Sequence, residues 1–246
     1  MDQARLIDDP ALDGAWNMSV DQALLATADA TGEAVLRFYR WSPATLSLGY
    51  FQSATDRLAH ESSRECNMVR RVTGGGAILH DRELTYSLCI PSQNRLSGEH
   101  QELYQQVHGA VIDVLSDWGI SAALFSDQAS AADKTRFLCF ERRTRGDIVL
   151  NGFKVVGSAQ RRLNKTVLQH GSILLARSDY SPELIGIHEI AGVEILESEL
   201  VSRLVEELAS RLGMAFRPSR LSPQEQSTAH EIQQKQFGHY DWTNRR

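Results

Sequence analysis

Residues 70–81 read RRVTGGGAILHD: a basic pair runs into three successive glycines and then into a short apolar stretch that ends at a histidine. Three glycines in a row cannot pack a core, but they let the backbone take unusual dihedral angles and lie against a ligand. Guanidinium and backbone N–H groups together suit a carboxylate, a phosphate or a developing oxyanion. A tight turn between two strands, with solvated arginines, fits the pattern equally, and the stretch is neither a Walker loop nor a Rossmann fingerprint. If the loop binds a ligand, the candidate contacts are Arg70, Arg71, Gly74, Gly75, Gly76 and His80.

A second stretch, residues 147–162, combines a hairpin pattern with a lysine. Asn151-Gly152 is typical of a type I′ turn, so residues 147–150 and 154–156 are predicted to pair as strands. A lysine between apolar neighbours, as Lys154 is, lies in a partly enclosed place where its ammonium needs a partner or a substrate carbonyl. The commoner alternative is a lysine on the solvent face of the hairpin. The small residues that follow leave room for a ligand: Gly157, Ser158 and Ala159.

Two further segments contain candidate site residues, but the residues alone do not assign their roles. His170 and Gly171 lie in a polar break, QHGS, inside a β-rich run, where the histidine suits a base, an orienting donor or a satisfied core residue. Cys139 lies in the segment FLCFE, whose apolar residues favour ordinary burial. Nearby basic residues favour a stabilised thiolate instead; they are Arg136, Arg142 and Arg143.

The bulk composition limits the class of protein. The 246 residues are 42% hydrophobic and 23% charged, which is typical of a globular chain. A net charge of -5 gives no overall positive field to attract nucleic acid or an anionic membrane. The N-terminus lacks a signal-peptide pattern, and no stretch approaches the ~18 apolar residues of a membrane span. Three cysteines without CxxC or zinc-finger spacing predict neither a disulfide framework nor a structural metal site, so we expect a cytoplasmic protein.

Hydrophobic periodicity and turn residues predict the remaining elements. Helices are expected at 16–28 with Ser19 as the cap, at 100–118 with Gly119 as the stop, and at 198–212 and 224–237. Strands at 34–39 and 45–50 are expected to be joined by a hairpin-like connection, and residues 126–135 to form an exposed loop. Further strands are expected at 69–72, 77–79, 84–90, 167–168 and 172–175.

Together these stretches resemble the biotin/lipoate protein ligase superfamily, which includes lipoate-protein ligase A and the octanoyltransferases and shares the BPL/LPL catalytic domain. The segments DQALL (21–25) and SLGYFQ (47–52) are also similar to that family's opening. The resemblance implies an α+β fold with a mixed, mostly antiparallel β-sheet flanked by helices, of the class II aminoacyl-tRNA synthetase and biotin synthetase kind. It also implies one catalytic domain over residues 1–246, with a core at about 14–215 and a helical tail at about 216–246.

The superfamily contains two chemistries, and the sequence favours one of them. Octanoyltransferases move an octanoyl group from acyl carrier protein, through a cysteine thioester, to a lysine of a lipoyl-carrier domain such as glycine cleavage H protein or an E2 subunit, and they need no cofactor. Lipoate-protein ligases activate a free acid with ATP and Mg²⁺. The segment HDRELTYS (80–87) and the place of Cys139 before the lysine hairpin resemble the transferases, whereas Gly76 is similar to the ligase loop. A non-catalytic module that binds lipoyl carriers is a third alternative.

For a transferase, the resemblance implies that Cys139 is the nucleophile and that Lys154 polarises the thioester carbonyl. Backbone N–H groups near the glycines or Gly157 would complete the oxyanion site. For a ligase, the basic side chains would hold an acyl-adenylate and Cys139 would be structural. A thiol that opens toward Lys154 therefore favours transfer, and a fully buried thiol favours ligation. The acyl tunnel is expected near Leu79 and Val156, and help in proton transfer from His80 or His170.

Overall fold

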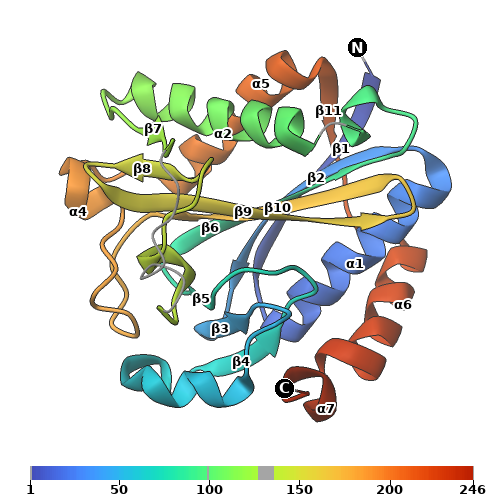
Figure 1. Cartoon of the computed structure of the whole chain (residues 1–246). Coiled ribbons are helices and arrows are strands. Elements are labelled where there is room, and N and C mark those ends of the chain that lie inside the picture. Colours follow the sequence, from blue (N-terminus) through green and yellow to red (C-terminus); the bar gives the residue numbers. More distant parts are fainter. Residues whose placement is uncertain (1, 99, 127–135, 246) are drawn as a thin grey trace.

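The computed structural model describes residues 2–98, 100–126 and 136–245, and one large sheet runs through them (Figure 1). Its eight strands lie in the order β11-β1-β2-β6-β10-β9-β8-β7. Strand β1 pairs in parallel with both neighbours, and every pair from β2 to β7 is antiparallel. The predicted α+β fold with a mixed, mostly antiparallel sheet is therefore confirmed. The strands are Asp2–Leu12 (β1), Ala34–Trp41 (β2), Glu83–Ile90 (β6), Ala123–Leu124 (β7), Ile148–Leu150 (β8), Phe153–Leu163 (β9), Thr166–Leu174 (β10) and Met214–Pro218 (β11).

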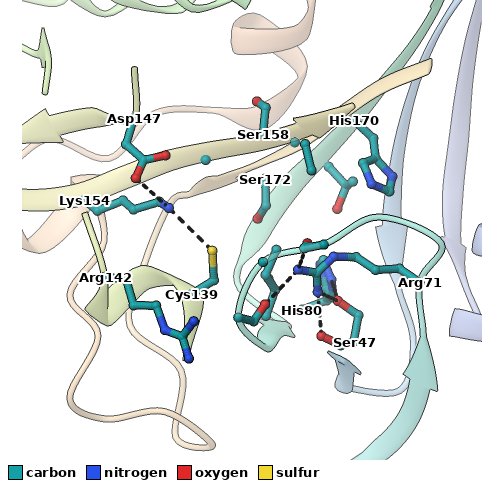
Figure 2. Close-up of a pocket in the computed structure, with 18 of the residues that line it drawn as sticks. Ser47, Arg71, His80, Cys139, Arg142, Asp147, Lys154, Ser158, His170 and Ser172 are labelled. Carbon is teal, nitrogen blue, oxygen red and sulfur yellow. Dashed lines mark hydrogen bonds and ion pairs between the residues drawn. The ribbon is translucent and has the colours of Figure 1, made fainter. Parts of the chain in front are cut away.

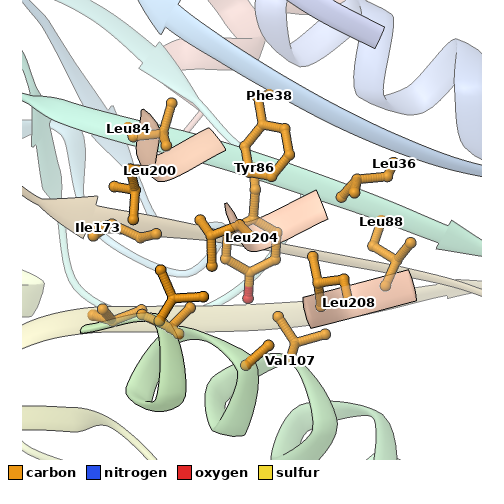
Figure 3. Packing of buried hydrophobic residues seen from close by; sticks show 14 of the residues in the cluster. Leu36, Phe38, Leu84, Tyr86, Leu88, Val107, Ile173, Leu200, Leu204 and Leu208 are labelled. Atoms are coloured by element: carbon orange, nitrogen blue, oxygen red, sulfur yellow. The ribbon is translucent and has the colours of Figure 1, made fainter. Parts of the chain in front are cut away.

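Helices cover both faces of this sheet (Figure 1). On one face, α2 (His100–Asp117) and α5 (Glu197–Leu212) pack their apolar sides against residues of β2, β6 and β10 (Figure 3). On the other face, α1 (Gly14–Thr31) packs with α6 (Pro223–Ile232). Strands β6 and β10 lie between the two layers, and all of their residues are buried. Burial on both faces explains why these two strands carry apolar residues without a strict alternation.

A second sheet has three strands in the order β4-β3-β5, and the loop with the three successive glycines joins two of them. The glycine loop, which we define as residues 71–77, joins β4 to β5. The predicted hairpin-like pair of 34–39 and 45–50 is wrong, because β2 belongs to the large sheet and β3 to the small one. The strands are Thr45–Leu48 (β3), Asn67–Arg70 (β4) and Ile78–His80 (β5). Shorter helical segments are Ala54–Ala59 (η1), Glu61–Ser63 (η2), Arg95–Ser97 (η3), Cys139–Glu141 (η4), Ile187–Ala191 (α4), Gln233–Phe237 (η5, a π-helical turn) and Tyr240–Thr243 (α7).

Helix α1 begins before the predicted cap. The side chain of Asp13 accepts a hydrogen bond from the N–H of Trp16 at 3.0 Å and so caps the first turn. Ser19 lies inside the helix instead and donates to the carbonyl of Ala15. The prediction of a helix here is confirmed, but its cap is corrected from Ser19 to Asp13.

No helix among the described residues is long and apolar enough to cross a membrane.

The predicted hairpin is confirmed, whereas three strands were not predicted. Asn151 and Gly152 have φ angles of 48° and 82°, and they join β8 to β9 as a type I′ turn requires. Strands β1, β7 and β11 had no prediction; β1 pairs with β11 over more than 200 residues of chain, which no local pattern reveals. Of the predicted loop at 126–135, residues 127–135 lie outside the described residues.

Candidate active site

A cavity of about 270 Å³ lies between the large sheet, the glycine loop and η4 (Figure 2). Among the predicted site residues, Arg70 alone does not line this cavity. The structure brings all of the others to its wall: Arg71, Gly74, Gly75, Gly76, His80, Cys139, Lys154, Gly157, Ser158, Ala159, His170 and Gly171.

Asp147, Lys154 and Cys139 form a line across one end of the cavity (Figure 2). The Lys154 ammonium contacts the Asp147 carboxylate at 2.9 Å and donates to the Cys139 sulfur at 3.4 Å. The lysine and aspartate side chains are only 3% and 2% exposed. Burial by itself lowers the pKa of Lys154, but the attraction of Cys139 and Asp147 outweighs burial and raises it. The lysine is therefore a fixed positive charge beside the sulfur.

Gly157 makes room for this lysine on the neighbouring part of strand β9. A Cβ atom at Gly157 would lie 2.6 Å from Cε and 2.8 Å from Nζ of Lys154. These distances are shorter than any ordinary contact between non-bonded atoms. A glycine here is thus part of the reason why the lysine can bend toward Cys139.

Asp147 is a site residue that the sequence analysis missed. Its Oδ2 atom also accepts hydrogen bonds from the N–H and hydroxyl of Thr144, at 2.7 and 3.0 Å, which fixes the carboxylate. The signal was present in the predicted hairpin. Because Val149 pairs with Lys154, Asp147 two residues earlier lies on the same face of the hairpin as the lysine.

Cys139 is the partly exposed member of an otherwise buried segment. Its neighbours Leu138 and Phe140 belong to the core, whereas the thiol lines the cavity. The main chain here is paired with the end of the glycine loop: the N–H of Ala77 donates to the carbonyl of Phe137, and the N–H of Cys139 donates to Ala77 at 2.7 Å. The glycine loop and the cysteine are therefore positioned together. The two other cysteines, Cys66 and Cys89, are buried.

Arg71 holds the glycine loop in shape from inside. Its guanidinium donates to the carbonyls of Gly74 and Gly76 at 2.7 and 2.8 Å, and to the carbonyl of Ser47 at 2.8 Å. Burial lowers the pKa of Arg71 to about 10, so the group stays protonated near neutral pH. The guanidinium donates to main-chain carbonyl oxygens, and these satisfy its buried donors although no carboxylate is among these contacts.

Arg70 points away from the cavity and supports the loop from outside. Its guanidinium donates to the carbonyls of Gly49 and Gln52 at 3.0 and 2.6 Å, and to that of Thr243 near the C-terminus at 3.0 Å. The assignment of Arg70 as a substrate contact is therefore corrected to a supporting role. Gly49 permits a close approach of two backbone segments, because a Cβ there would lie 2.0 Å from the carbonyl oxygen of Gly75.

His80 is held on all sides at the small-sheet wall. Its Nδ1 contacts Glu83 at 3.1 Å, its Nε2 contacts the hydroxyl of Ser47 at 2.8 Å, and its ring stacks on Trp41 at 3.8 Å. Burial lowers the pKa of His80 despite the carboxylate beside it. The ring is thus neutral at neutral pH, and both of its nitrogens are already engaged.

His170 joins a buried ionic network between α1 and the large sheet. Its Nδ1 faces Asp21 at 3.3 Å and its Nε2 contacts the hydroxyl of Thr73 at 2.7 Å. Burial raises the pKa of Asp21, but His170 and Arg37 outweigh burial and lower it. Tyr39 donates to the same carboxylate at 2.8 Å. This network spans α1, β2 and β10 and was not predicted, because its members are far apart in sequence.

Ser158 is the centre of a second buried network. Its hydroxyl contacts the Tyr86 hydroxyl and His108 Nε2, both at 2.6 Å. His108 Nδ1 faces the carbonyl of Gly146 at 2.8 Å, and because a carbonyl only accepts, Nδ1 carries the proton and Nε2 accepts from Ser158. Burial lowers the pKa of His108 to about 4. The hydroxyl of Ser158 is therefore fixed, with its proton directed away from the cavity.

The apolar part of the wall agrees with the prediction at Ile78, which is next to Leu79 in the chain, and differs from it elsewhere. Leu79 and Val156 are buried in two different hydrophobic clusters and do not line the cavity. Apolar side chains at the wall come from β5, α1 and β2 instead: Ile78, Met18, Tyr39 and Trp41. Among the described residues, no group of three or more His, Cys, Asp or Glu side chains is placed to hold a metal ion.

Comparison with known proteins agrees with this geometry. Residues 13–185 match the family model of the lipoyl protein ligase A/B catalytic domain. Over its full length the chain is 31% identical to the whole of octanoyltransferase LipM from Brevibacillus brevis, and over 96% of its length it is 32% identical to 96% of that from Clostridioides difficile.

Solved structures agree in fold. A bi-partite lipoate protein ligase from Thermoplasma acidophilum superposes with a TM-score of 0.78 at 19% identity, over 99% of this chain and 97% of that one. Lipoate-protein ligase A bound with ATP gives 0.79 at 21% identity, over 98% of both chains. The resemblance seen in the motifs is confirmed: the chain belongs to the lipoyl protein ligase A/B catalytic domain family.

Proposed function

We propose that this protein takes an octanoyl group from acyl carrier protein onto Cys139 and passes it to a lysine of a lipoyl-carrier domain. Octanoyl transfer in protein lipoylation is the activity of the full-length LipM relatives, and it is the activity of this chain. The observation that carries the mechanism is the thiol of Cys139, which opens into the cavity 3.4 Å from the Lys154 ammonium. A partly exposed thiol beside a fixed cation is the environment that a nucleophilic thiolate needs.

The first step exchanges one thioester for another. The Cys139 thiolate attacks the octanoyl carbonyl, the new S–C bond forms, and the bond to the carrier's pantetheine sulfur breaks. The departing thiolate takes up the proton that Cys139 has lost, so charge and atoms balance. Lys154 stabilises the attacking thiolate first and the tetrahedral oxyanion next, with the Asp147 carboxylate holding the ammonium in place.

The main chain of Cys139 itself does not supply the oxyanion site. Its N–H already donates to the carbonyl of Ala77 at 2.7 Å, so this donor is occupied. We therefore propose Lys154 as one donor to the oxyanion that forms at the reacting carbon, beside N–H groups of the glycine loop or Gly157. Removing one donor from such a site costs about 10²–10³-fold in rate in other enzymes.

The second step makes the amide. The amine of the carrier-domain lysine attacks the octanoyl thioester, the C–N bond forms, and Cys139 leaves as a thiolate that Lys154 again stabilises. The proton released by the amine restores the thiol. His80 and His170 were candidates for this transfer, but both nitrogens of each ring already have partners in the structure. We therefore place neither histidine in the proton path.

The octanoyl chain would occupy the apolar side of the cavity, next to Ile78 and Trp41. Each buried methylene contributes about 0.8 kcal/mol, so the six methylenes of octanoate contribute about 5 kcal/mol to binding. Such burial contributes to the binding of an acyl chain in this cavity.

Gly76 was the feature that resembled a ligase, and the structure offers a different reason for it. A Cβ at this position would lie 3.0 Å from the N atom and 3.1 Å from the Cα of Cys139. The glycine therefore allows the loop to pack against the cysteine turn. Because Gly76 has this packing role beside the proposed nucleophile, its presence does not by itself favour ligation.

We further propose that residues 1–246 act as one catalytic domain. Strand β11 pairs with β1 and so closes one edge of the large sheet. Beyond it, the indole N–H of Trp242 donates to the carbonyl of Arg70 at 2.8 Å, directly before the glycine loop. The helical tail is thus in contact with Arg70, which supports the glycine loop.

The function is tested by transfer to an acceptor. Purified protein is mixed with octanoyl-acyl carrier protein and an apo lipoyl-carrier domain, with and without ATP and Mg²⁺. We expect octanoylation of the acceptor lysine without ATP and its loss in Cys139→Ala. Acceptor modification only from free acid with ATP, and unchanged by Cys139→Ala, would identify a ligase. Tight binding of the carrier domain without any acylation would identify a binding module.

A further inference from the structure

Four arginines surround the turn that carries the candidate nucleophile. Residues 136–145 contain these four basic side chains and one acid, Glu141, although the whole chain has a net charge of -5. Arg142 lines the cavity beside Cys139 (Figure 2). We call the set the arginine rim; its members are Arg136, Arg142, Arg143 and Arg145.

Within the described ranges of the chain, the contacts of the rim are mostly to uncharged groups. Arg142 donates to the main-chain carbonyl of Arg136 at 2.5 Å, and Arg143 donates to that of Gly152 at 2.9 Å. A carbonyl oxygen fixes a guanidinium in place but does not cancel its charge. In the part of the chain that the structure describes, only Arg136 of the rim has a carboxylate within ion-pair distance, Glu141 at 3.6 Å, and its side chain is 55% exposed.

Arg57, Arg70 and Arg71 also donate to main-chain carbonyls, but several arginines elsewhere in the molecule are paired differently. They contact carboxylates at short range, both in the interior and on the surface: Arg5 with Glu225, Arg37 with Asp9 and Asp21, Arg40 with Asp8 and Glu197, and Arg211 with Glu207 and Asp113. The rim is therefore a positive region on an acidic protein. Arg142 lines the cavity of Cys139, and Arg136 and Arg143 line a neighbouring hollow that shares Lys154 with this cavity. Arg145 lines another hollow, which shares Ser158 and Ala159 with the cavity. Such a region raises the encounter rate with an acidic partner.

We infer that the arginine rim docks an acidic surface of the acyl carrier protein that delivers the octanoyl group; this inference rests on the proposed function. A thioester at the end of a flexible arm reaches Cys139 only if its carrier stops at the cavity mouth. Four charges spread over ten residues match a protein surface better than the single phosphate of the arm. The rim sets affinity for the carrier, while Lys154 and Cys139 perform the chemistry.

The test separates docking from chemistry. Arg136, Arg143 and Arg145 are changed to glutamine singly and together, and Arg142 is kept because it lines the cavity. The control is Arg217→Gln, an arginine of similar exposure (59%) on β11 at the other edge of the sheet. Formation of the octanoyl adduct on Cys139 is followed in single turnovers at increasing donor concentration. Three donors are compared: octanoyl-acyl carrier protein, octanoyl-phosphopantetheine and octanoyl-pantetheine.

With the carrier-bound donor, each substitution should raise the half-saturating concentration about two- to fivefold, and the triple variant about tenfold or more. The maximal rate should stay unchanged, because Arg136, Arg143 and Arg145 do not line the cavity and only Arg142, which is kept, is beside the thiol. Salt at 0.5 M should remove most of the difference, because exposed charges are then screened over about 4–5 Å. Both small donors should react equally with all variants. Melting temperatures of the variants should match that of the control.

Three results would overturn the inference. Rim variants that saturate like Arg217→Gln would show that the rim does not dock the carrier. An equal loss with octanoyl-phosphopantetheine would assign the rim to the phosphate of the arm. A loss confined to transfer from Cys139 to the lipoyl-carrier domain would assign it to the acceptor. If the unaltered protein forms no adduct with any donor, the proposed function itself is refuted, and the inference with it.

Discussion

Replacing Gly157 with alanine tests whether Lys154 must lie where the structure places it. The added Cβ would lie 2.6 Å from Cε of the lysine, whereas non-bonded carbons rest at about 3.5–4.0 Å. The lysine side chain must therefore move by about 1 Å. Because its end is flexible and the strand backbone is not in the way, the lysine can move while the fold stays intact.

The expected loss follows from that displacement. Misplacing a positioned group by about 1 Å costs on the order of 10²-fold in rate, which corresponds to about 2.7 kcal/mol of activation free energy. Overpacking at one position costs on the order of 1 kcal/mol in stability, a fall of about 2–4 °C in melting temperature for a chain of this size. Activity should therefore fall much further than stability.

The assay is quenched-flow formation of the octanoyl adduct on Cys139, read by intact mass, beside thermal unfolding of the same sample. Leu163→Ala, at the exposed end of the same strand (39% exposed), is the matched control and should acylate at the unaltered rate. If Gly157→Ala also acylates at the unaltered rate, the position of Lys154 does not limit the chemistry and the reasoning is refuted.

Three further changes have defined outcomes. Asp147→Asn breaks a buried ion pair, so we expect the free energy of unfolding in urea to fall by about 3–5 kcal/mol. Lys154 also loses a partner that raises its pKa, so the alkaline limb of the pH–rate profile for acylation of Cys139 should move to lower pH. An unmoved limb would contradict this. Burial lowers the pKa of His108 to about 4; the unfolded chain then takes up its proton first as pH falls from about 6.5 to 4, which should remove about 3 kcal/mol of stability. His108→Gln should flatten that fall in pH-dependent urea titrations, and an equally steep fall would rule out this histidine as its cause. Trp242→Phe loses one hydrogen bond and should destabilise the protein by about 1 kcal/mol, whereas Tyr240→Phe, at a side chain that is 76% exposed, should not.

Local signals explain which parts of the fold could be predicted. The Asn151-Gly152 turn and the long periodic helices are encoded by neighbouring residues, so the sequence predicts them directly. Strand β1 reads DQARLIDDPAL, with acids and a proline that disfavour strands. It is a strand because β2 and β11 pair with it, and that pairing is a tertiary effect. The separation of β2 from β3 into two sheets is tertiary in the same way.

The candidate site shows the same division. The sequence motifs predicted most of the cavity wall, because the glycine loop and the lysine hairpin are each a single contiguous stretch of sequence. Arg70 was misassigned, since its neighbour Arg71 has the same sequence signal and only packing shows which of them faces the cavity. Asp147 could have been predicted from strand alternation. The Asp21 and Ser158 networks could not, because their members come from helices and strands far apart in the chain.

The central claim is that Cys139 carries the acyl group, and one measurement tests it most directly. The protein is mixed with octanoyl-acyl carrier protein in the absence of ATP and acceptor, and its intact mass is recorded before and after hydroxylamine. We predict one octanoyl adduct that hydroxylamine removes, that peptide mapping places on Cys139, and that Cys139→Ala does not form. An unmodified protein, or the same adduct in Cys139→Ala, would contradict the claim.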